Sequence, residues 1–431
     1  MMAIPRTSGL VTSDSHPLSK VDFAMADVRM RGFRQRMEVH RAQDLIRNLI
    51  APLDEEFVPI HSAGGRILSA PVTSEVDVPA FPRSAMDGYA VRSEETYGAG
   101  QYNPLTFQVI GEVTPGKRFD GVMNSGQTVR IMTGAPIPEG ADAVLMAEYT
   151  SESDGIMTAT EAVTPKKNIG RIGEDIKAGD ELFPGGRRLR AQDLGVLASV
   201  GHPEVNVRRV PRVTLLITGN ELLKPGEKPR DAMIVDSNSI MLNHLIERDG
   251  GVVAEVRHLS DDRELIRDSL LKAPGDILVT TGGTSVGVED HAPTLIAEEG
   301  ELLVHGVAMR PSAPTGFGTV GGRPVFLLPG NPVSCLAAYD FFVALAVRIM
   351  AGRKEEWPYR KTTLPLKDRI SSQIGRLDYA RVKLENGHAI LLATSGASAL
   401  STTTLADGFV VVGQDSEGMA AGEEAEVWLY D

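Results

Sequence analysis

Residues 212–351 alternate between short apolar runs typical of β-strands and longer stretches with helical patterning. The first run, at 213–218, is uninterrupted, and the helix candidate that follows it ends at Gly250-Gly251. Further strand candidates lie at 252–256, 276–281 and 325–328. Strands and helices that alternate in this way form a parallel sheet with helices on both faces. We therefore expect an α/β domain over residues 208–352.

The segments on either side of this region have mainly β-like patterning. Residues 65–166 carry short strand candidates broken by Pro and Gly, and the C-terminal segment contains the hairpin signal Asn386-Gly387. Helix candidates at 38–50 and 191–199 flank the first of these segments. The predicted architecture is multidomain α/β, with a tail (1–36), an elongated helical and hairpin domain (37–64 and 167–207), an inserted β-rich domain (65–166), the α/β domain (208–352) and a C-terminal β-barrel or sandwich (353–431).

The charge balance and the cysteine count exclude several classes of function. The 57 acidic and 44 basic side chains give a net charge of −13, which argues against nucleic acid as a partner. The one cysteine, Cys335, rules out an internal disulfide framework and a Cys-cluster zinc site. The most apolar stretch, 341–347, is shorter than the ~20 residues that cross a bilayer, and residues 1–36 lack the apolar core of a signal peptide. We expect a cytoplasmic protein with no membrane partner.

Two glycine motifs compete as ligand sites. Residues 316–321 match G-x-G-x-x-G, the pattern of a nucleotide-dependent dehydrogenase when it opens a helix after a strand. The following Gly322-Arg323-Pro324 instead leads into the strand candidate at 325–328, so we interpret this motif as a hairpin.

The second motif is Thr281-Gly282-Gly283-Thr284-Ser285-Val286-Gly287, which ends the strand candidate at 276–281. Ligands of open α/β sheets bind at the carboxyl ends of strands. Free backbone N–H groups and hydroxyl groups in such a loop suit a phosphate. No Gly-Lys-Ser/Thr follows, so the motif is not a Walker loop. Its composition favours an anion site over a plain loop.

Carboxylates follow several strands of the predicted sheet. They are Glu221, Asp236, Asp261 and Asp290. Together at one sheet edge they would suit a divalent cation beside a phosphorylated ligand. Asp236 and Asp261 also suit the N-cap of a helix, Asp261 with Glu264 at capping-box spacing, and both interpretations stay open. The nine His residues show no close metal-ligand spacing, which argues against a His-based zinc or iron site.

Two more loops are rigid and polar enough for a site. In the first, Pro79 and Pro82 fix the backbone before Asp87, although an ordinary turn explains the pattern equally well. The second, which leads from Leu328 to Ser334, feeds a helix through Pro332 and sets Ser334 near its positive end. A plain helix start is the alternative there.

In combination, these segments resemble the molybdopterin molybdenumtransferase family, the MoeA and gephyrin E-domain type. The matching stretches, in the family's order, are Pro82-Arg83-Ser84-Ala85-Met86-Asp87-Gly88-Tyr89-Ala90, Arg130-Ile131-Met132-Thr133-Gly134-Ala135, Gly173-Glu174-Asp175-Ile176, Thr218-Gly219-Asn220-Glu221-Leu222, Gly282-Gly283-Thr284-Ser285-Val286-Gly287 and Pro329-Gly330-Asn331-Pro332-Val333-Ser334. The resemblance implies an elongated subunit with a central MogA-like parallel-sheet domain. It also implies a homodimer whose site lies between the α/β domain of one subunit and the β-rich domain of the other.

The resemblance further implies a reaction and roles for individual residues. Adenylylated molybdopterin and molybdate would give molybdenum cofactor and AMP, with Mg²⁺ as the cofactor. Glu221, Asp261 and Asp290 would bind the metal and act at the pyrophosphate bond, with Asp87, Thr133 and Asp175 acting from the neighbouring domains. Residues that would hold the pterin phosphate are Thr281, Gly282, Gly283, Ser285 and Gly287. Molybdopterin adenylyltransferase and molybdoenzyme maturation proteins would be partners.

The expected molybdate pocket is where the sequence departs from the family pattern. Lys-Pro-Gly-Lys-Pro of many relatives stands here as Arg310-Pro311-Ser312-Ala313-Pro314, and a position often basic in relatives is Gly306. The residues that still match are Arg310, Pro314, Ser334, Arg381 and Ser398. The pocket therefore keeps two cations at most. This leaves two alternatives open beside the molybdate enzyme, a tungstate-using variant and a non-catalytic molybdopterin-binding or scaffold protein.

Overall fold

The computed structural model describes residues 36–283 and 290–430, and its centre is a six-stranded sheet. In spatial order the strands are β16 (Val252–Leu259), β13 (Arg212–Thr218), β17 (Ile277–Thr281), β21 (Arg323–Leu328), β20 (Gly316–Val320) and β18 (Gly300–His305). The first four are parallel, as expected, and the last two add an antiparallel edge. Strands β13, β17 and β21 are buried on both faces, which explains their continuous apolar sequences.

Helices cover both faces of this sheet, which confirms the α/β prediction. One face packs against α1 (Val39–Leu49), α3 (Asn238–Asp249), α6 (Pro332–Ala338) and α7 (Ala344–Met350). The other packs against α4 (Arg263–Lys272) and α5 (Ala292–Glu299). Helix α3 ends at Gly250, whose φ of +94° favours glycine, so the predicted stop is confirmed.

The G-x-G-x-x-G segment forms a hairpin, as we interpreted it. Strands β20 and β21 pair antiparallel, and Gly321 and Gly322 turn the chain with φ of +57° and +78°. The segment opens no helix, so the structure removes the reason to expect a nucleotide site there.

One helical segment, Pro332–Met350, is longer than the apolar stretch noted in the sequence. It joins α6 and α7 through a π-helical turn at Tyr339–Val343. Among the described residues it is the one helix long and apolar enough to cross a membrane, but 94% of its apolar 18-residue stretch is buried inside the protein. The core helix of a soluble protein has the same properties.

A smaller part follows α1 and is built from both sides of the β-rich segment. Strand β1 (Glu55–Pro59) pairs with β12 (Glu204–Arg208), β2 (Val72–Thr73) pairs with β11 (Glu181–Phe183), and α2 (Ala191–Ser199) packs on them. We expected residue 65 to begin the inserted domain. Leu68 instead belongs to this part's core, because it bridges Val207 and packs on Leu197.

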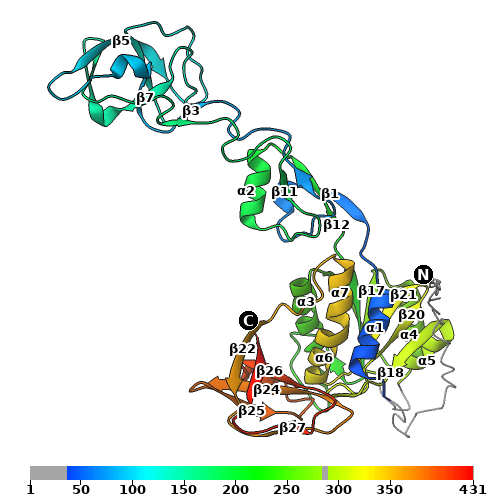
Figure 1. Cartoon of the computed structure of the whole chain (residues 1–431). Coiled ribbons are helices and arrows are strands. Elements are labelled where there is room, and N and C mark those ends of the chain that lie inside the picture. Colours follow the sequence, from blue (N-terminus) through cyan, green and yellow to red (C-terminus); the bar gives the residue numbers. More distant parts are fainter. Residues whose placement is uncertain (1–35, 284–289, 431) are drawn as a thin grey trace, which may run out of the picture.

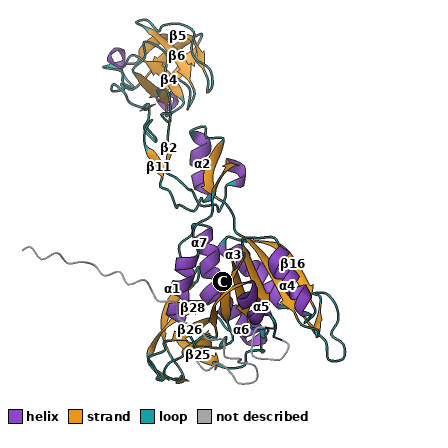
Figure 2. Ribbon diagram, turned by 90° about the vertical axis from the view of Figure 1, so that its right-hand side faces the viewer, coloured by secondary structure: helices purple, strands orange, loops and turns teal. Residues whose placement is uncertain are grey.

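The β-rich segment forms a second six-stranded sheet. Its order is β7 (Ala143–Met146), β4 (Gly88–Val91), β6 (Gln127–Ile131), β5 (Leu105–Val113), β9 (Ile156–Ala159) and β8 (Thr150–Ser153). Strands β3 (Arg83–Ser84) and β10 (Ile169–Gly170) pair where the chain enters and leaves it. Figures 1 and 2 show this sheet at one end of an elongated molecule and the α/β part at the other.

The C-terminal segment forms a third sheet beside the α/β part. Its strands are β19 (Met309–Arg310), β22 (Arg360–Pro365), β24 (Leu377–Glu385), β25 (His388–Ala393), β26 (Gly408–Val412) and β28 (Glu424–Leu429). Asn386 and Gly387 turn β24 into β25 with positive φ, which confirms the hairpin prediction. A bridge between Leu366 and Ala389 joins the β22 side to β25. Closure into a full barrel, like the exact domain limits, stays a prediction.

Further short elements include 3-10 helices at Ile60–Ser62, Ser93–Thr96 and Ala147–Tyr149 and several short strands. The short strands are β14 (Leu222–Leu223) with β15 (Ile234–Val235) and β23 (Ile370–Ser371) with β27 (Gly418–Met419), and a further short helix is α8 (Ser401–Thr404).

Candidate active site

The loops after β13 and β16 are bound to each other at the carboxyl edge of the central sheet. The backbone N–H of Asn220 donates to Asp261 Oδ2 at 3.0 Å, and the N–H of Asp261 donates to Asn220 Oδ1 at 3.2 Å. Glu221 follows directly and is exposed. This reciprocal pair holds Glu221 and Asp261 on adjacent loops.

Asp261 does not cap α4, so one of the two interpretations that the sequence left open for it is excluded. The N-cap is Asp262, whose carboxylate accepts from Leu265 N–H at 2.9 Å. Asp261 is therefore not used by the helix, and its carboxylate belongs to the edge of the sheet.

The glycine loop approaches β13 so closely that only glycine fits. A Cβ on Gly282 would lie 2.2 Å from Thr218 O, and its φ is +84°. A Cβ on Gly283 would lie 3.1 Å from Thr218 Oγ1 and 3.9 Å from Asp290 Oδ1. The loop therefore brings Asp290 to the same edge as Glu221 and Asp261. Thr281 is buried in β17, and Ser285 and Gly287 lie outside the described residues.

Asp236 has a structural partner that the sequence did not indicate. Its Oδ1 accepts from Ser239 N–H at 3.0 Å, which supports the capping interpretation, and its Oδ2 lies 2.9 Å from His258 Nε2. The spacing between histidines along the sequence does not reveal this pair. His258 lies in β16 opposite Ile217, and this cross-strand placement is the signal that locates it beside α3.

The three expected metal ligands do not form a complete metal-binding site by themselves. Within residues 36–283 and 290–430, no group of three or more His, Cys, Asp or Glu side chains is close enough to hold a metal ion. The donor chemistry nevertheless suits Mg²⁺, which in proteins typically takes one or two carboxylates and completes its shell with water and substrate phosphates. The structure leaves Glu221 exposed and Asp261 and Asp290 partly exposed.

The two arginines of the expected oxyanion pocket lie on opposite faces of β24. Arg310 is paired with Asp378, a fully buried carboxylate that also binds Arg376 at 2.9 Å. Asp378 and Arg381 are three residues apart in the same strand, so their side chains point to opposite faces. Arg310 is therefore tied to a carboxylate that it shares with Arg376, and this pairing was not visible in the sequence.

Arg381 faces the α/β part and is buried without a counter-ion among the described residues. It shares its face with Tyr379, which packs in the same core cluster as α6 and α7. Its Nη2 donates to Ser395 O, whereas Nε and Nη1 are buried and have no hydrogen-bond partner in the described structure. Burial lowers the pKa of this guanidinium from its usual range. Unused donors on a buried cation are what an oxyanion requires.

The start of α6 joins this region to the C-terminal sheet. Val333 N–H donates to Ala397 O at 2.9 Å, one residue before the exposed Ser398. Ser334 is buried, and its carbonyl accepts from Ser312 Oγ at 2.7 Å. Ser312 adopts a φ of +93°, so serine occupies a position that favours glycine, and the half-buried Pro314 lies two residues on.

Asp87 and Thr133 meet in the β-rich part. Asp87 Oδ1 accepts from the backbone N–H of Thr133 at 2.7 Å and from its hydroxyl at 2.8 Å. These two hydrogen bonds, the backbone one first, lower the pKa of Asp87. Asp175 is exposed next to Glu174, which pairs with Arg83. Figure 1 shows β3 and β7 of this part far from β17 and β21, so one chain does not bring the two sets of predicted residues together.

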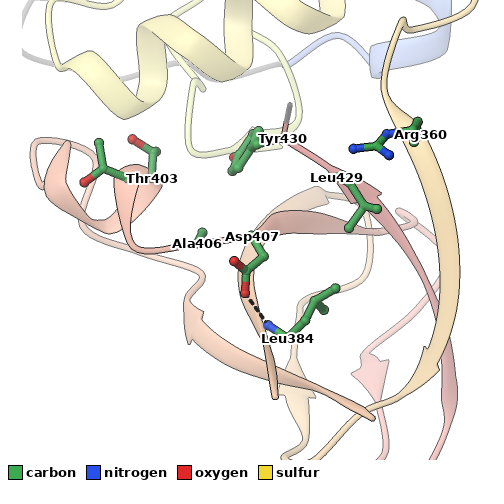
Figure 3. A pocket seen from close by; sticks show the side chains of 8 residues that line it. Arg360, Leu384, Thr403, Ala406, Asp407, Leu429 and Tyr430 are labelled. Atoms are coloured by element: carbon green, nitrogen blue, oxygen red, sulfur yellow. Dashed lines mark hydrogen bonds between the residues drawn. The ribbon is translucent and has the colours of Figure 1, made fainter. Parts of the chain in front are cut away.

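A cavity of about 540 Å³ opens on the C-terminal part (Figure 3). Its lining residues are Arg360, Leu384, Thr403, Thr404, Ala406, Asp407, Leu429 and Tyr430. The Asp407 carboxylate in it accepts from Leu384 N–H at 2.6 Å, which is a structural bond between neighbouring strands. None of the predicted site residues lines this cavity, so we do not place the chemistry there.

Comparison with known proteins agrees with this geometry. Three family models match consecutive parts: "MoeA N-terminal region (domain I and II)" over 37–201, "Probable molybdopterin binding domain" over 214–348 and "MoeA C-terminal region (domain IV)" over 363–430. Molybdopterin molybdenumtransferase of Staphylococcus aureus (strain COL) is 32% identical over 406 residues, covering 92% of this chain and 96% of that protein. The chain belongs to the molybdopterin molybdenumtransferase family.

Other relatives support the same membership. Molybdopterin molybdenumtransferase 2 of Mycobacterium tuberculosis is 32% identical over 404 residues, which cover 90% of this chain and 98% of the relative. The crystal structure of the molybdopterin biosynthesis MoeA protein from Pyrococcus horikoshii matches with a TM-score of 0.79 at 33% identity, over 92% of this chain and all of that chain. The multidomain α/β architecture of this chain is therefore that of a MoeA protein.

Proposed function

We propose that this chain is a molybdopterin molybdenumtransferase acting in molybdenum cofactor biosynthesis. It takes adenylylated molybdopterin and molybdate, transfers molybdenum to the pterin dithiolate and releases AMP. The observation that carries the proposal is the similarity to relatives of that name over 92% of this chain. The exposed or partly exposed carboxylates at the sheet edge, and Arg381, buried without a counter-ion among the described residues, fit this reaction. The adenylylated substrate, the homodimer, Mg²⁺ and a cytoplasmic location are parts of this proposal.

The residues of the sheet edge have distinct tasks in this reaction. Gly282 and Gly283 allow the loop to lie against Thr218, and backbone N–H groups of this loop would bind the phosphate of molybdopterin. Glu221, Asp261 and Asp290 would hold Mg²⁺, which when bound withdraws charge from the phosphates. The Asn220–Asp261 pair fixes two of these loops in advance, so less ordering is needed on binding.

The oxyanion end of the site depends on Arg381. Molybdate carries two negative charges, and the free donors Nε and Nη1 suit its oxygens. Arg310 keeps the loop 310–315 attached to β24 through Asp378. The carboxylate of Asp87, kept ionised by Thr133, would reach the site only from the second subunit of a homodimer.

Release of AMP tests the proposal directly. Purified protein, adenylylated molybdopterin, MgCl₂ and either molybdate or tungstate should yield AMP and a metal-loaded pterin that activates an apo-molybdoenzyme. Release with tungstate but not molybdate would support the tungstate-using alternative. Absence of AMP with either oxyanion would contradict the enzyme and favour the scaffold interpretation.

A further inference from the structure

Asn238 is the first residue of α3, and its side-chain amide has a hydrogen-bonded nitrogen and an oxygen without a partner among the described residues. Its side-chain Nδ2 donates to Gly330 O at 2.8 Å, and this bond sets which end of the amide faces which way. The residue is 7% exposed. Its Oδ1 is buried and has no hydrogen-bond partner among the residues that the structure describes. A buried acceptor left without a donor is unfavourable, and native proteins keep few of them.

Asn238 lies where two candidate ligand loops meet. Gly330, its hydrogen-bond partner, follows β21, and an added Cβ there would lie 3.5 Å from Gly282 Cα. Gly282 opens the glycine loop after β17. Two residues before Asn238, Asp236 is bound to Ser239 N–H and to His258, so the backbone that carries Asn238 is fixed. The unused oxygen is therefore rigidly held at the carboxyl edge of the sheet.

We propose that Asn238 Oδ1 accepts a hydrogen bond from the exocyclic amino group of the heterocycle of the ligand bound at this edge. An amide oxygen accepts hydrogen bonds, and an ionised phosphate has no donor to offer it. Asn238 Oδ1 therefore contacts the heterocycle and not the phosphate. This inference rests on the proposed function, whose substrate contains two amino-bearing heterocycles, a pterin and an adenine. Asn238 is thus a specificity residue that distinguishes an amino-bearing ring from a phosphate alone.

A second asparagine of the chain supplies a matched control. Asn206 in β12 also has a buried Oδ1 without a partner in the described structure, while its Nδ2 donates to Glu55 at 2.7 Å. It lies in the smaller part that contains β1, β12 and α2, remote from the central sheet edge (Figure 1). Replacing either asparagine by alanine removes the same chemical group, and only Asn238 lies beside the glycine loop.

The test measures binding by calorimetry to wild type, Asn238→Ala and Asn206→Ala. The probes are a side-chain phosphorylated pterin, AMP, each of these two without its exocyclic amino group, and ribose 5-phosphate. We expect Asn238→Ala to weaken binding of the pterin or of AMP about tenfold, the usual effect of one hydrogen bond to a buried group, with ribose 5-phosphate changed less than about twofold. The probe without the amino group should bind wild type and Asn238→Ala equally, and Asn206→Ala should bind every probe as wild type does.

Several outcomes would overturn the inference. Equal weakening of all probes would mean that Asn238 only holds the Gly330 loop, and no weakening would mean that its oxygen meets no ligand. If Asn238→Ala does not fold, wild type alone decides: equal affinity for the probes with and without the amino group contradicts the inference. The proposed function fails separately, if wild type releases no AMP. If wild type is active but Asn238→Ala still prefers the probes with an amino group as strongly as wild type does, only this inference is contradicted.

Discussion

Arg310 is paired with Asp378, whose carboxylate is fully buried on one side of β24, while Arg381 lies on the other side with two donors that no described residue accepts from. The family pattern places both arginines near the oxyanion, and the structure gives them different tasks. Arg310 shares the buried carboxylate with Arg376 and secures a loop, so moving it toward a ligand would leave Asp378 with one partner. The positive charge that faces the expected pocket comes from Arg381.

Substituting the two arginines should separate these tasks. In Arg381→Met we expect the KM for molybdate to rise about tenfold or more, because a charge-assisted contact is lost, with the melting temperature unchanged or higher. In Arg310→Met we expect the free energy of unfolding to fall by about 2 kcal/mol, since Asp378 keeps only Arg376, with the KM for molybdate within about threefold. Steady-state kinetics and urea unfolding measure both. An equal rise in the KM for molybdate in the two variants would contradict this separation of tasks between Arg381 and Arg310.

Gly282 should not tolerate a side chain. In Gly282→Ala the added Cβ meets Thr218 O at 2.2 Å in a backbone with φ of +84°, so we expect a loss of about 3 kcal/mol in unfolding free energy and weaker binding of phosphorylated ligands. Gly186 is the matched control, because its φ is +78° and nothing lies within 4 Å of an added Cβ. Gly186→Ala should lose only about 1 kcal/mol. Similar losses in the two variants would show that backbone strain, not close approach, explains the glycine.

The acid limit of activity should depend on Thr133. Asp87 accepts two hydrogen bonds from Thr133, and both lower the pKa of its carboxyl. Thr133→Val keeps the backbone bond and removes the hydroxyl, so the pKa of Asp87 should rise toward its ordinary value. If Asp87 acts as a carboxylate, the acid limb of kcat/KM should move to higher pH in the same direction. Carboxyl NMR titration measures the first effect, and a pH–rate profile measures the second; a limb that stays in place would remove Asp87 from the reaction.

Local signals in the sequence predicted much of the fold. The helix at 191–199 and the Asn386-Gly387 hairpin are confirmed because neighbouring residues alone determine them. The same is true of the G-x-G-x-x-G hairpin, whose turn residues lie next to its strands. The parallel pairing of the first four central strands also followed from the alternation of elements, whereas the antiparallel edge depends on a hairpin returning to the sheet.

Contacts between distant residues decide what the sequence did not show. Asp262, and not Asp261, caps α4 because Asp261 is bound to a loop 41 residues away. The pairing of Arg310 with Asp378 needs the parallel contact between β19 and β24. Asn238 gave no motif of its own, since its significance lies in Gly330, 92 residues further on. Sequence patterns report periodicity along the chain, and these features arise from packing across it.

The distance between the two sets of candidate residues predicts complementation between inactive subunits. Asp87 lies in the β-rich part and Glu221 at the edge of the central sheet, and Figure 1 shows these two parts at opposite ends of the molecule. If a homodimer builds each site from both subunits, Asp87→Asn and Glu221→Gln should each inactivate both sites of their own dimer. In a heterodimer of the two variants, one site carries both changes and the other carries neither.

Unfolding and refolding the two variants together in equal amounts should therefore restore about a quarter of wild-type AMP release, because about half of the dimers are mixed and each has one intact site. Light scattering establishes that the protein is a dimer, and each variant refolded alone provides the inactive baseline. A double variant carrying both changes, refolded with wild type, is the matched control, since its mixed dimers have two sites with one defect each. Mixtures that stay at the baseline while mixed dimers form would show that Asp87 and Glu221 do not act in one shared site.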